Sequence, residues 1–210
     1  MGEDTPPVSA GAAADAAAAQ RAAGMMGRYC DGDARAFHEI YALLAPRLLG
    51  YLIGLVGDRA TGEDLLQLTF MKLHQSRSTY VKGANPVPWM YTIAHRTCLD
   101  ELRRRKRAKV RLSVDGALPM EPAVDITGVP ESAASTVDEP AIARGMRALA
   151  SLPELQRQAV LLTKIHGRTT AEAATIMGTS AGAIKLRAHR GYVALRRVLG
   201  KPEKVLEGRS

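Results

Sequence analysis

The stretch TTAEAATIMGTSAGAIKLRAHRGYVALRR (residues 169–197) decides how this chain is expected to fold. Thr169 with Glu172 three residues later is the pattern of a capped helix start, and Gly178 predicts the end of that helix. The Thr-Ser pair that follows can cap a second helix. Two helices joined by a short turn containing glycine form a helix-turn-helix, a unit that places its second helix in a DNA groove.

The second helix of this stretch is expected to have a buried side and a basic side. On a helical projection one face collects Ile184, Ala188, Gly191, Leu195, Val198 and Leu199, which we expect to be buried. The opposite side carries Lys185, Leu186, His189, Arg190 and Arg197. Lysine and arginine can bind phosphates or guanine acceptors, and a leucine can contact a thymine methyl group. Two alternatives stay open: an ordinary solvated face, or an apolar strip of Leu186 and Val193 for a protein partner.

Composition and charge fit a small helical protein with a polyanionic partner. Of the 210 residues 46% are hydrophobic but only 4% aromatic, so the core must be built mainly from aliphatic side chains, which favours thin helical bundles. The net charge of +8 points to nucleic acid or an anionic membrane surface. No run of about 18 uninterrupted apolar residues and no signal-peptide layout occurs, so we expect a soluble intracellular protein.

The sequence contains no pattern typical of an enzyme or of a cofactor site. There is no phosphate-binding GxxxxGK[ST] loop, no HExxH and no recognisable pair of nucleophile and base. Cys30 and Cys98 are far apart, and His95 with Cys98 forms only half of a possible metal site. We therefore expect no catalytic activity, no metal and no cofactor.

Changes in composition divide the chain into five segments. Residues 1–24, rich in Ala, Gly and Pro, are expected to be a disordered tail, and residues 25–111 a helical domain. Residues 112–140 are acidic and rich in proline, and they read as a flexible linker. Residues 141–199 form a second helical domain, followed by a polar tail at 200–210. The expected fold class is all-α, with two small helical domains joined by the linker.

Within the first domain a long helix carries both aromatic and basic residues. The preceding helix is expected to start at the segment TGED, with Thr61 as cap and Asp64 three residues on. The long helix should begin near residue 87 and run into RRRKRAKVR, a strip suited to a phosphate backbone. Tyr80, Trp89 and Tyr91 lie near its start and could stack on unpaired bases, although a core position is the favoured interpretation of Tyr91.

Three blocks in this order carry a family resemblance: DRATGEDLLQLTFMKLHQ, WMYTIAHRTCLDELRRRKR and LPELQRQAVLLTKIHGRTTAEAATIMGTSAGAIKLRAHRGYVALRR. Together they resemble a bacterial sigma factor of the extracytoplasmic-function type, which has sigma region 2 and sigma region 4 joined by a linker. The resemblance implies a cytoplasmic, non-enzymatic subunit that binds core RNA polymerase and promoter DNA, and directs promoter recognition and melting. It also implies control by an anti-sigma factor until a stress or envelope signal arrives. The ending KLRAHRGYVALRR resembles a subset whose anti-sigma partners are embedded in the membrane.

The resemblance also implies roles for matching residues. Asp64, Gln67, Leu68 and Met71 match the helix that docks on core polymerase, with Leu68 where the family often has Glu. The −10 element would be contacted by Tyr80, Asn85, Trp89, Arg96, Arg103 and Arg104. The −35 element would be read by Lys185, Leu186, Arg187, His189 and Arg190, of which Leu186 and His189 depart from the usual residues.

The main alternative is a stand-alone transcriptional regulator that uses the helix-turn-helix as a dimer on an operator. A regulator of that kind needs a ligand-binding or dimerisation module, whereas this first domain carries a basic and aromatic helix. An RNA-binding or nucleoid-associated protein would explain the charge, but not the three ordered blocks.

Overall fold

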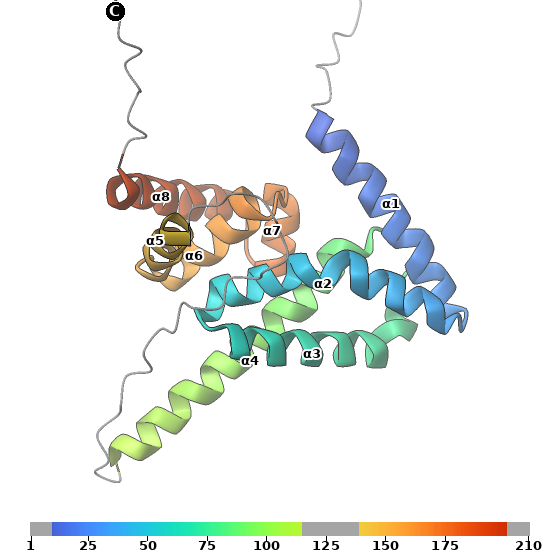
Figure 1. Ribbon diagram of the computed structural model, residues 1–210, viewed down its shortest axis with the longest axis horizontal. Helices are drawn as coiled ribbons and strands as arrows, with labels where there is room; N and C mark the ends of the chain where they lie inside the picture. The colour runs from blue at the N-terminus through green and yellow to red at the C-terminus, as the bar shows by residue number, and fades with distance from the viewer. Residues whose placement is uncertain (1–9, 115–138, 201–210) are drawn as a thin grey trace, which may run out of the picture.

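The computed structural model describes residues 10–114 and 139–200, and the regular elements in these ranges are all helical (Figure 1). The first range holds α1 (Ala10–Cys30), α2 (Ala34–Val56), α3 (Arg59–Ser76), the short 3-10 turn η1 (Arg77–Thr79) and α4 (Pro86–Val114). The second holds α5 (Glu139–Ala150), α6 (Glu154–Val160), the π-helical turn η2 (Leu161–Ile165), α7 (Thr170–Met177) and α8 (Ala181–Leu199). The predicted all-α class is confirmed. Most of the predicted linker and the tail from residue 201 lie outside the described residues.

The N-terminal segment is helical where the structure describes it, so the predicted disordered tail is wrong from Ala10 onward. Ala22 and Met26 of α1 are completely buried, and α1 packs against α2 and α4. Alanine has the highest intrinsic helix propensity, and its small side chain allows close packing without an obvious apolar stripe. The absence of apolar periodicity was therefore a poor guide to disorder in this segment.

Helix α2 forms the centre of the first group of helices. It has 23 residues and, by length and hydropathy alone, could cross a membrane, yet half of that apolar window is buried inside the protein. Its buried side chains recur at spacings of three and four residues, as on one face of a helix: Ile40, Leu44, Leu48, Tyr51, Leu52 and Leu55. The helix ends at Gly57, which has a left-handed backbone conformation.

The cap of helix α3 lies three residues before the predicted one. Asp58 is the cap, and its carboxylate accepts hydrogen bonds from both the backbone N–H and the hydroxyl of Thr61. A carboxylate at this position also interacts favourably with the helix dipole, which explains why Asp58 takes the role predicted for Thr61. Asp64 is therefore not part of a capping box and is exposed on α3.

The helix-turn-helix has the predicted geometry. Thr169 and Glu172 form a complete capping box, and Ser180 caps α8. Gly178 ends α7 with a φ of 60°, a left-handed conformation that costs glycine little because it has no Cβ atom. The turn between α7 and α8 is thus determined by local sequence.

The predicted buried face of α8 is correct only in its first three turns. Ile184, Ala188 and Gly191 are buried and Leu195 is half-buried. Val198 and Leu199 are 62% and 53% exposed, so the prediction for these two residues is wrong. The last turn of α8 lines an open hollow beside α5 instead of a packed seam.

The two groups of helices pack directly against each other. Helix α7 lies on α4, and η2 lies on α2, so that their buried side chains form one continuous core. Figure 1 shows the group α5–α8 seated on one side of the first group, while α4 extends away beneath it. The far end of the α4 helix therefore lies away from the second group.

Two histidines lie at this core, of which His95 is buried and His166 half-buried. The Tyr51 hydroxyl donates a hydrogen bond to Nδ1 of His95 at 2.8 Å, and the Tyr91 hydroxyl donates to Nδ1 of His166 at 3.1 Å. Burial lowers the pKa of each histidine to about 4, helped by Arg96 for His95 and by Arg168 and Arg47 for His166. Both side chains are therefore neutral at pH 7.

We predict that the free energy of unfolding falls as the pH drops from about 6.5 towards 4. In that range the two histidines bind protons in the unfolded chain but stay neutral in the folded protein. Each histidine therefore lowers the free energy of unfolding by up to about 3 kcal/mol. His95→Asn keeps an acceptor for Tyr51 but cannot titrate, so it should remove roughly half of this pH dependence. Urea unfolding of both proteins at several pH values measures the effect, and an unchanged slope would contradict it.

Candidate nucleic-acid interface

The predicted DNA-reading residues of α8 lie mostly on its exposed side. Lys185, Leu186, His189 and Arg190 are exposed, whereas Arg187 is half-buried. Leu186 is 50% exposed and lies on the same side of α8 as the basic residues, so its side chain is accessible beside them. The side chains most accessible to a DNA groove therefore come from a single face, and Arg187 lies at its border.

Other residues, which the sequence did not single out, adjoin this face. A groove of about 220 Å³ between η2 and α8 is lined by Lys164 and Tyr192 together with Lys185 and His189. The ammonium of Lys164 and the guanidinium of Arg196 each lie 5.9 Å from the Tyr192 ring centroid. Tyr192 could have been found from its helical spacing to His189, but Lys164 comes from another element and could not.

Helix α4 carries a second basic stripe. Trp89, Arg96 and Arg103 are seven residues apart, so they follow one another along one side of the helix. Arg96 and Arg103 are exposed, and Arg103 pairs with Asp100 at 3.3 Å. On another side of α4, Met90, Tyr91 and Ala94 are buried, which confirms the core interpretation of Tyr91.

The loop before α4 is held by an aromatic pair. The Tyr80 and Trp89 rings are 5.6 Å apart at 36°, and the Tyr80 hydroxyl donates to the carbonyl of Ala84. Both aromatic side chains are half-buried. Asn85 is exposed, and its side-chain oxygen accepts a hydrogen bond from the backbone N–H of Val87 at 3.0 Å, where it caps the start of α4. The loop is thus ordered against the same end of α4 that begins the basic stripe.

A second groove lies between α3 and α4. Asp64, Gln67, Leu68 and Met71 lie on one exposed side of α3, and the two apolar side chains are 42% and 56% exposed. All four line a groove of about 390 Å³. Its opposite wall is formed by α4 residues that include Glu101 and Arg104. Arg104 therefore lies with this α3 group and not with Trp89 and Arg96.

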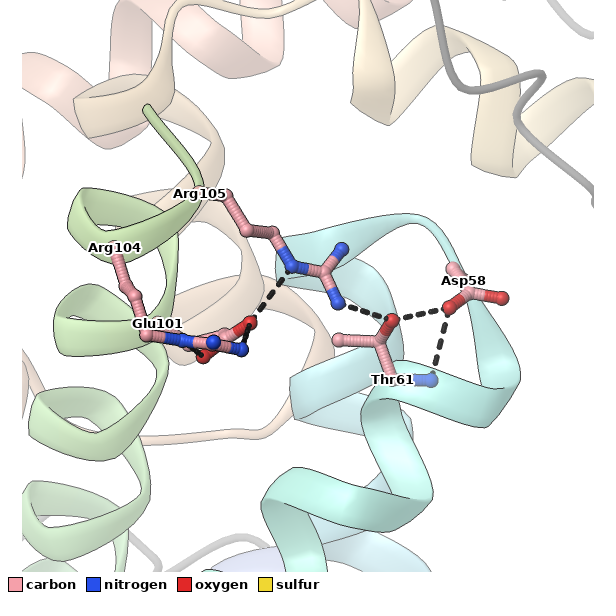
Figure 2. Close-up of polar contacts among 5 residues, drawn as sticks. All are labelled: Asp58, Thr61, Glu101, Arg104 and Arg105. Carbon is pink, nitrogen blue, oxygen red and sulfur yellow. Dashed lines mark hydrogen bonds and ion pairs between the residues drawn. The ribbon is translucent and has the colours of Figure 1, made fainter. Parts of the chain in front are cut away.

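A polar network joins the two walls of this groove (Figure 2). Arg104 donates to both carboxylate oxygens of Glu101 at 2.7 and 2.8 Å, and Nε of Arg105 donates to the same carboxylate at 2.9 Å. Arg105 also donates to the Thr61 hydroxyl at 2.7 Å, and Thr61 in turn donates to Asp58. These contacts connect the cap of α3 to α4.

The hydrogen bonds of this network stabilise the ionised forms of its two carboxylates. Hydrogen bonds from Arg104 and Arg105 lower the pKa of Glu101 to about 2. Hydrogen bonds from Thr61 lower the pKa of Asp58. Both carboxylates are therefore fully ionised at pH 7. The ion pair of Glu101 and Arg105 could have been predicted from their spacing of four residues. The contact of Arg105 with Thr61 is tertiary and could not.

His95 and Cys98, which could have formed half of a metal site, are packed inside the protein. Both residues are buried, and Nδ1 of His95 accepts the Tyr51 hydroxyl. Burial raises the pKa of the Cys98 thiol to about 12, so it is protonated at pH 7. In residues 10–114 and 139–200 no group of three or more His, Cys, Asp or Glu side chains is placed to hold a metal ion.

We predict that Glu101→Gln lowers the free energy of unfolding by about 1–2 kcal/mol, because two guanidinium groups lose a charged acceptor. Arg103→Gln is a matched control, since it breaks the exposed pair with Asp100 and should change stability by less than about 0.5 kcal/mol. Chemical unfolding at pH 7 compares the two. Equal effects of the two variants would show that the network adds no stability beyond an ordinary surface pair.

Two sequence families match this chain, one in each group of helices. Residues 40–108 match Sigma-70 region 2, and residues 146–195 match Sigma-70, region 4. The first match contains α3 and the basic stripe of α4, and the second contains the helix-turn-helix.

Curated proteins match over nearly the whole chain. RNA polymerase sigma factor CarQ of Myxococcus xanthus is 38% identical over 179 residues, which are 85% of this chain and 97% of that protein. The ECF RNA polymerase sigma factor SigF of Caulobacter vibrioides is 36% identical over 173 residues, 81% of this chain and 89% of that protein.

Solved structures share the arrangement of helices. The sigma factor RpoE of Bartonella quintana, solved in complex with the anti-sigma factor NepR, superposes with a TM-score of 0.65 at 27% identity, over 78% of this chain and 96% of that one. CnrH, solved with the cytosolic domain of CnrY, superposes with a TM-score of 0.61 at 20% identity, over 86% and 97% of the two chains. The second likeness concerns the fold alone.

Proposed function

This chain belongs to the extracytoplasmic-function sigma factors of RNA polymerase, and from that premise we propose which of its surfaces perform each step of initiation. It is a transcription initiation factor that binds core RNA polymerase and promoter DNA, and it is not an enzyme. The observation that carries the proposal is that three exposed faces, one with apolar residues on α3 and basic ones on α4 and α8, lie on separate helices.

The exposed side of α3 is the proposed docking surface for core polymerase. Leu68 and Met71 offer apolar area, and Asp64 and Gln67 offer polar contacts beside it. Interfaces commonly combine such an apolar centre with a polar rim. The Glu101–Arg104–Arg105 network supports this surface from α4, and we accordingly assign Arg104 to it in place of the −10 role that the resemblance implies.

The two basic faces are proposed to contact the two promoter elements. Tyr80, Asn85, Trp89, Arg96 and Arg103 would receive the −10 element, where aromatic rings can stack on an unpaired base and arginines can follow the backbone. The exposed face of α8 would read the −35 element, with Lys185, His189 and Arg190 at hydrogen-bonding positions and Leu186 against a base methyl group. Arg187, half-buried, would contact a phosphate.

We further propose that an anti-sigma factor controls this protein in the cytoplasm. The Bartonella quintana relative was solved with an anti-sigma factor bound, and it covers most of this chain. The resemblance of residues 185–197 to factors with membrane-embedded anti-sigma partners favours a partner of that kind and an envelope or stress signal. A stand-alone regulator is disfavoured because the region 2 match accounts for the first group of helices.

The function is tested by reconstituting the protein with core RNA polymerase and transcribing a promoter library. Start sites above those of core polymerase alone are expected, at sites that share −10 and −35 elements. The absence of such start sites would remove the basis for the proposal.

We predict that Arg190→Ala weakens promoter use by about 1–3 kcal/mol and relaxes the preference at one base of the −35 element. Arg197→Ala, also exposed on α8, is the matched control and should leave base preference unchanged. Transcription from single-base promoter variants measures both effects. An equal loss with Arg190→Ala on every promoter would assign this residue to a phosphate.

We predict that Leu68→Asp and Met71→Asp each weaken core polymerase binding at least about tenfold, because a charge replaces an apolar contact at the docking surface. Leu155→Asp, a change at a residue that is also 50% exposed but lies on α6, should bind normally. Affinity is measured by competition with labelled wild-type protein. Normal binding of core polymerase by both α3 variants would show that the docking surface is not on this side of α3.

A further inference from the structure

The loop of residues 80–85 is contacted from the end of α1, through side chains that the assigned functions do not use. Asp31, which directly follows α1, forms an ion pair with Lys82 of the loop. The neighbouring Cys30 thiol donates to the carbonyl of Arg77, three residues before the loop, at 3.4 Å. Two successive residues at the end of α1 therefore hold the loop and the turn that leads into it.

A third contact joins the preceding residue, Tyr29, to His74 near the end of α3 (Figure 1). Nε2 of His74 lies 3.2 Å from the Arg77 guanidinium, which can only donate, so in the neutral ring Nε2 accepts and Nδ1 carries the proton. The Nδ1–H group therefore donates to the Tyr29 hydroxyl. Arg77 also donates to the His74 carbonyl at 2.9 Å. The end of α3 and the turn after it are thus joined to each other and to α1.

The end of α1 is itself fixed to the rest of the protein. Ala22 and Met26 of α1 are completely buried in the core. Arg28, near the end of the helix, pairs with Asp33 at 3.4 Å and with Glu39 of α2. The turn that follows α1 is therefore held against α2, and it offers a stable support for a neighbouring loop.

The loop, in contrast, has little packing of its own. Val81 is 72% exposed, and residues 82–85 are exposed as well. The ring of Tyr80, at the start of the loop, packs on Trp89 of α4. A segment with so few buried apolar contacts opens at a low cost in free energy. Contacts from outside the loop therefore affect how much of the time it stays in one conformation.

Order in this loop matters for the recognition proposed above. A loop that is already ordered binds its ligand more tightly than a mobile one, because binding then removes less conformational entropy. Capture of a base also requires that the base be unstacked. A preformed loop can offset that cost for a base that fits it, and it thereby discriminates among bases.

We propose that Asp31 is a positioning residue for −10 recognition, which holds Lys82 and with it the loop in the conformation that captures a base. Cys30 and Tyr29 support the same conformation from the two preceding positions. All three residues of α1 and its turn lie before residues 40–108, the segment that matches Sigma-70 region 2. The proposal rests on the −10 function proposed for the loop, but the support given by Asp31 can be measured in the free protein.

The first test uses Trp89, the only tryptophan in the chain, whose ring packs on Tyr80 of the loop. Acrylamide quenching of its fluorescence in the free full-length protein reports the fraction of molecules with an open loop. Asp31→Asn should raise this fraction about two- to fivefold, the effect of losing one exposed ion pair. Asp31→Lys should raise it further, because two ammonium groups then repel. Asp31→Glu keeps the carboxylate and should remain close to wild type.

Two further variants separate the ion pair from a general change of charge. Glu39→Gln is the matched control, because Glu39 is also an exposed carboxylate in an ion pair near the end of α1, but its partner is Arg28 and not the loop. Its quenching should equal that of the wild type. Asp31→Lys combined with Lys82→Asp re-forms the pair with exchanged charges and should restore wild-type quenching. Wild-type quenching in Asp31→Lys, or no restoration by the exchanged pair, would overturn the proposal.

The second test measures base preference in transcription by core RNA polymerase reconstituted with each variant. On promoters that differ by one base of the −10 element, Asp31→Lys should reduce the preference at the captured base at least about twofold. Preferences in the −35 element should not change, whereas general damage would lower transcription equally on every promoter.

The two tests together distinguish the proposal from the function on which it rests. An unchanged −10 preference in a variant with raised Trp89 quenching would overturn the positioning role of Asp31. If instead the sigma function were wrong, the wild-type protein itself would not direct transcription. Quenching of Trp89 in the free protein would still report whether Asp31 holds the loop.

Discussion

The structure depends on the burial of several sides of one helix, α4. Met90, Tyr91 and Ala94 belong to the continuous core, α3 packs along another side, and α7 of region 4 packs on a third. What remains exposed is a narrow stripe through Arg96 and Arg103, in line with the half-buried Trp89, and the basic residues 104–107. The constraint that a helix face must be either packed or polar therefore determines where nucleic acid can be contacted in region 2.

The same constraint explains how neighbouring arginines acquire different surroundings. Arg103 and Arg104 are adjacent in sequence but point about 100° apart on the helix, so Arg103 lies on the exposed stripe and Arg104 faces the groove beside α3. There Glu101 holds both Arg104 and Arg105, and Arg105 reaches the cap of α3 through Thr61 (Figure 2). A run of basic residues that looks uniform in sequence thus serves both an inter-helix network and a solvent-facing strip.

The helix-turn-helix could be predicted in detail because its signals are local. The capping box at Thr169 and Glu172, the left-handed Gly178 and the cap at Ser180 all act within one or two turns of the chain. The same method failed for α1 and for the end of α8, where the outcome depends on distant partners. Ala22 is buried because α2 and α4 lie beside it, while Val198 and Leu199 stay exposed because they line an open hollow beside α5.

The sequence by itself determined the helical class, the helix-turn-helix and the three family blocks in order. These features depend on periodicity, capping residues and motif spacing, which involve residues close together in the chain. Only the tertiary structure decided that Arg104 lies with Leu68 and Met71, and that Lys164 adjoins the face of α8 that carries Lys185 and His189. It also decided that His166 of region 4 lies between Tyr51 and Tyr91 of region 2. These contacts join residues 40 or more positions apart, or residues on separate helices, and such pairings follow from how helices pack and not from local sequence.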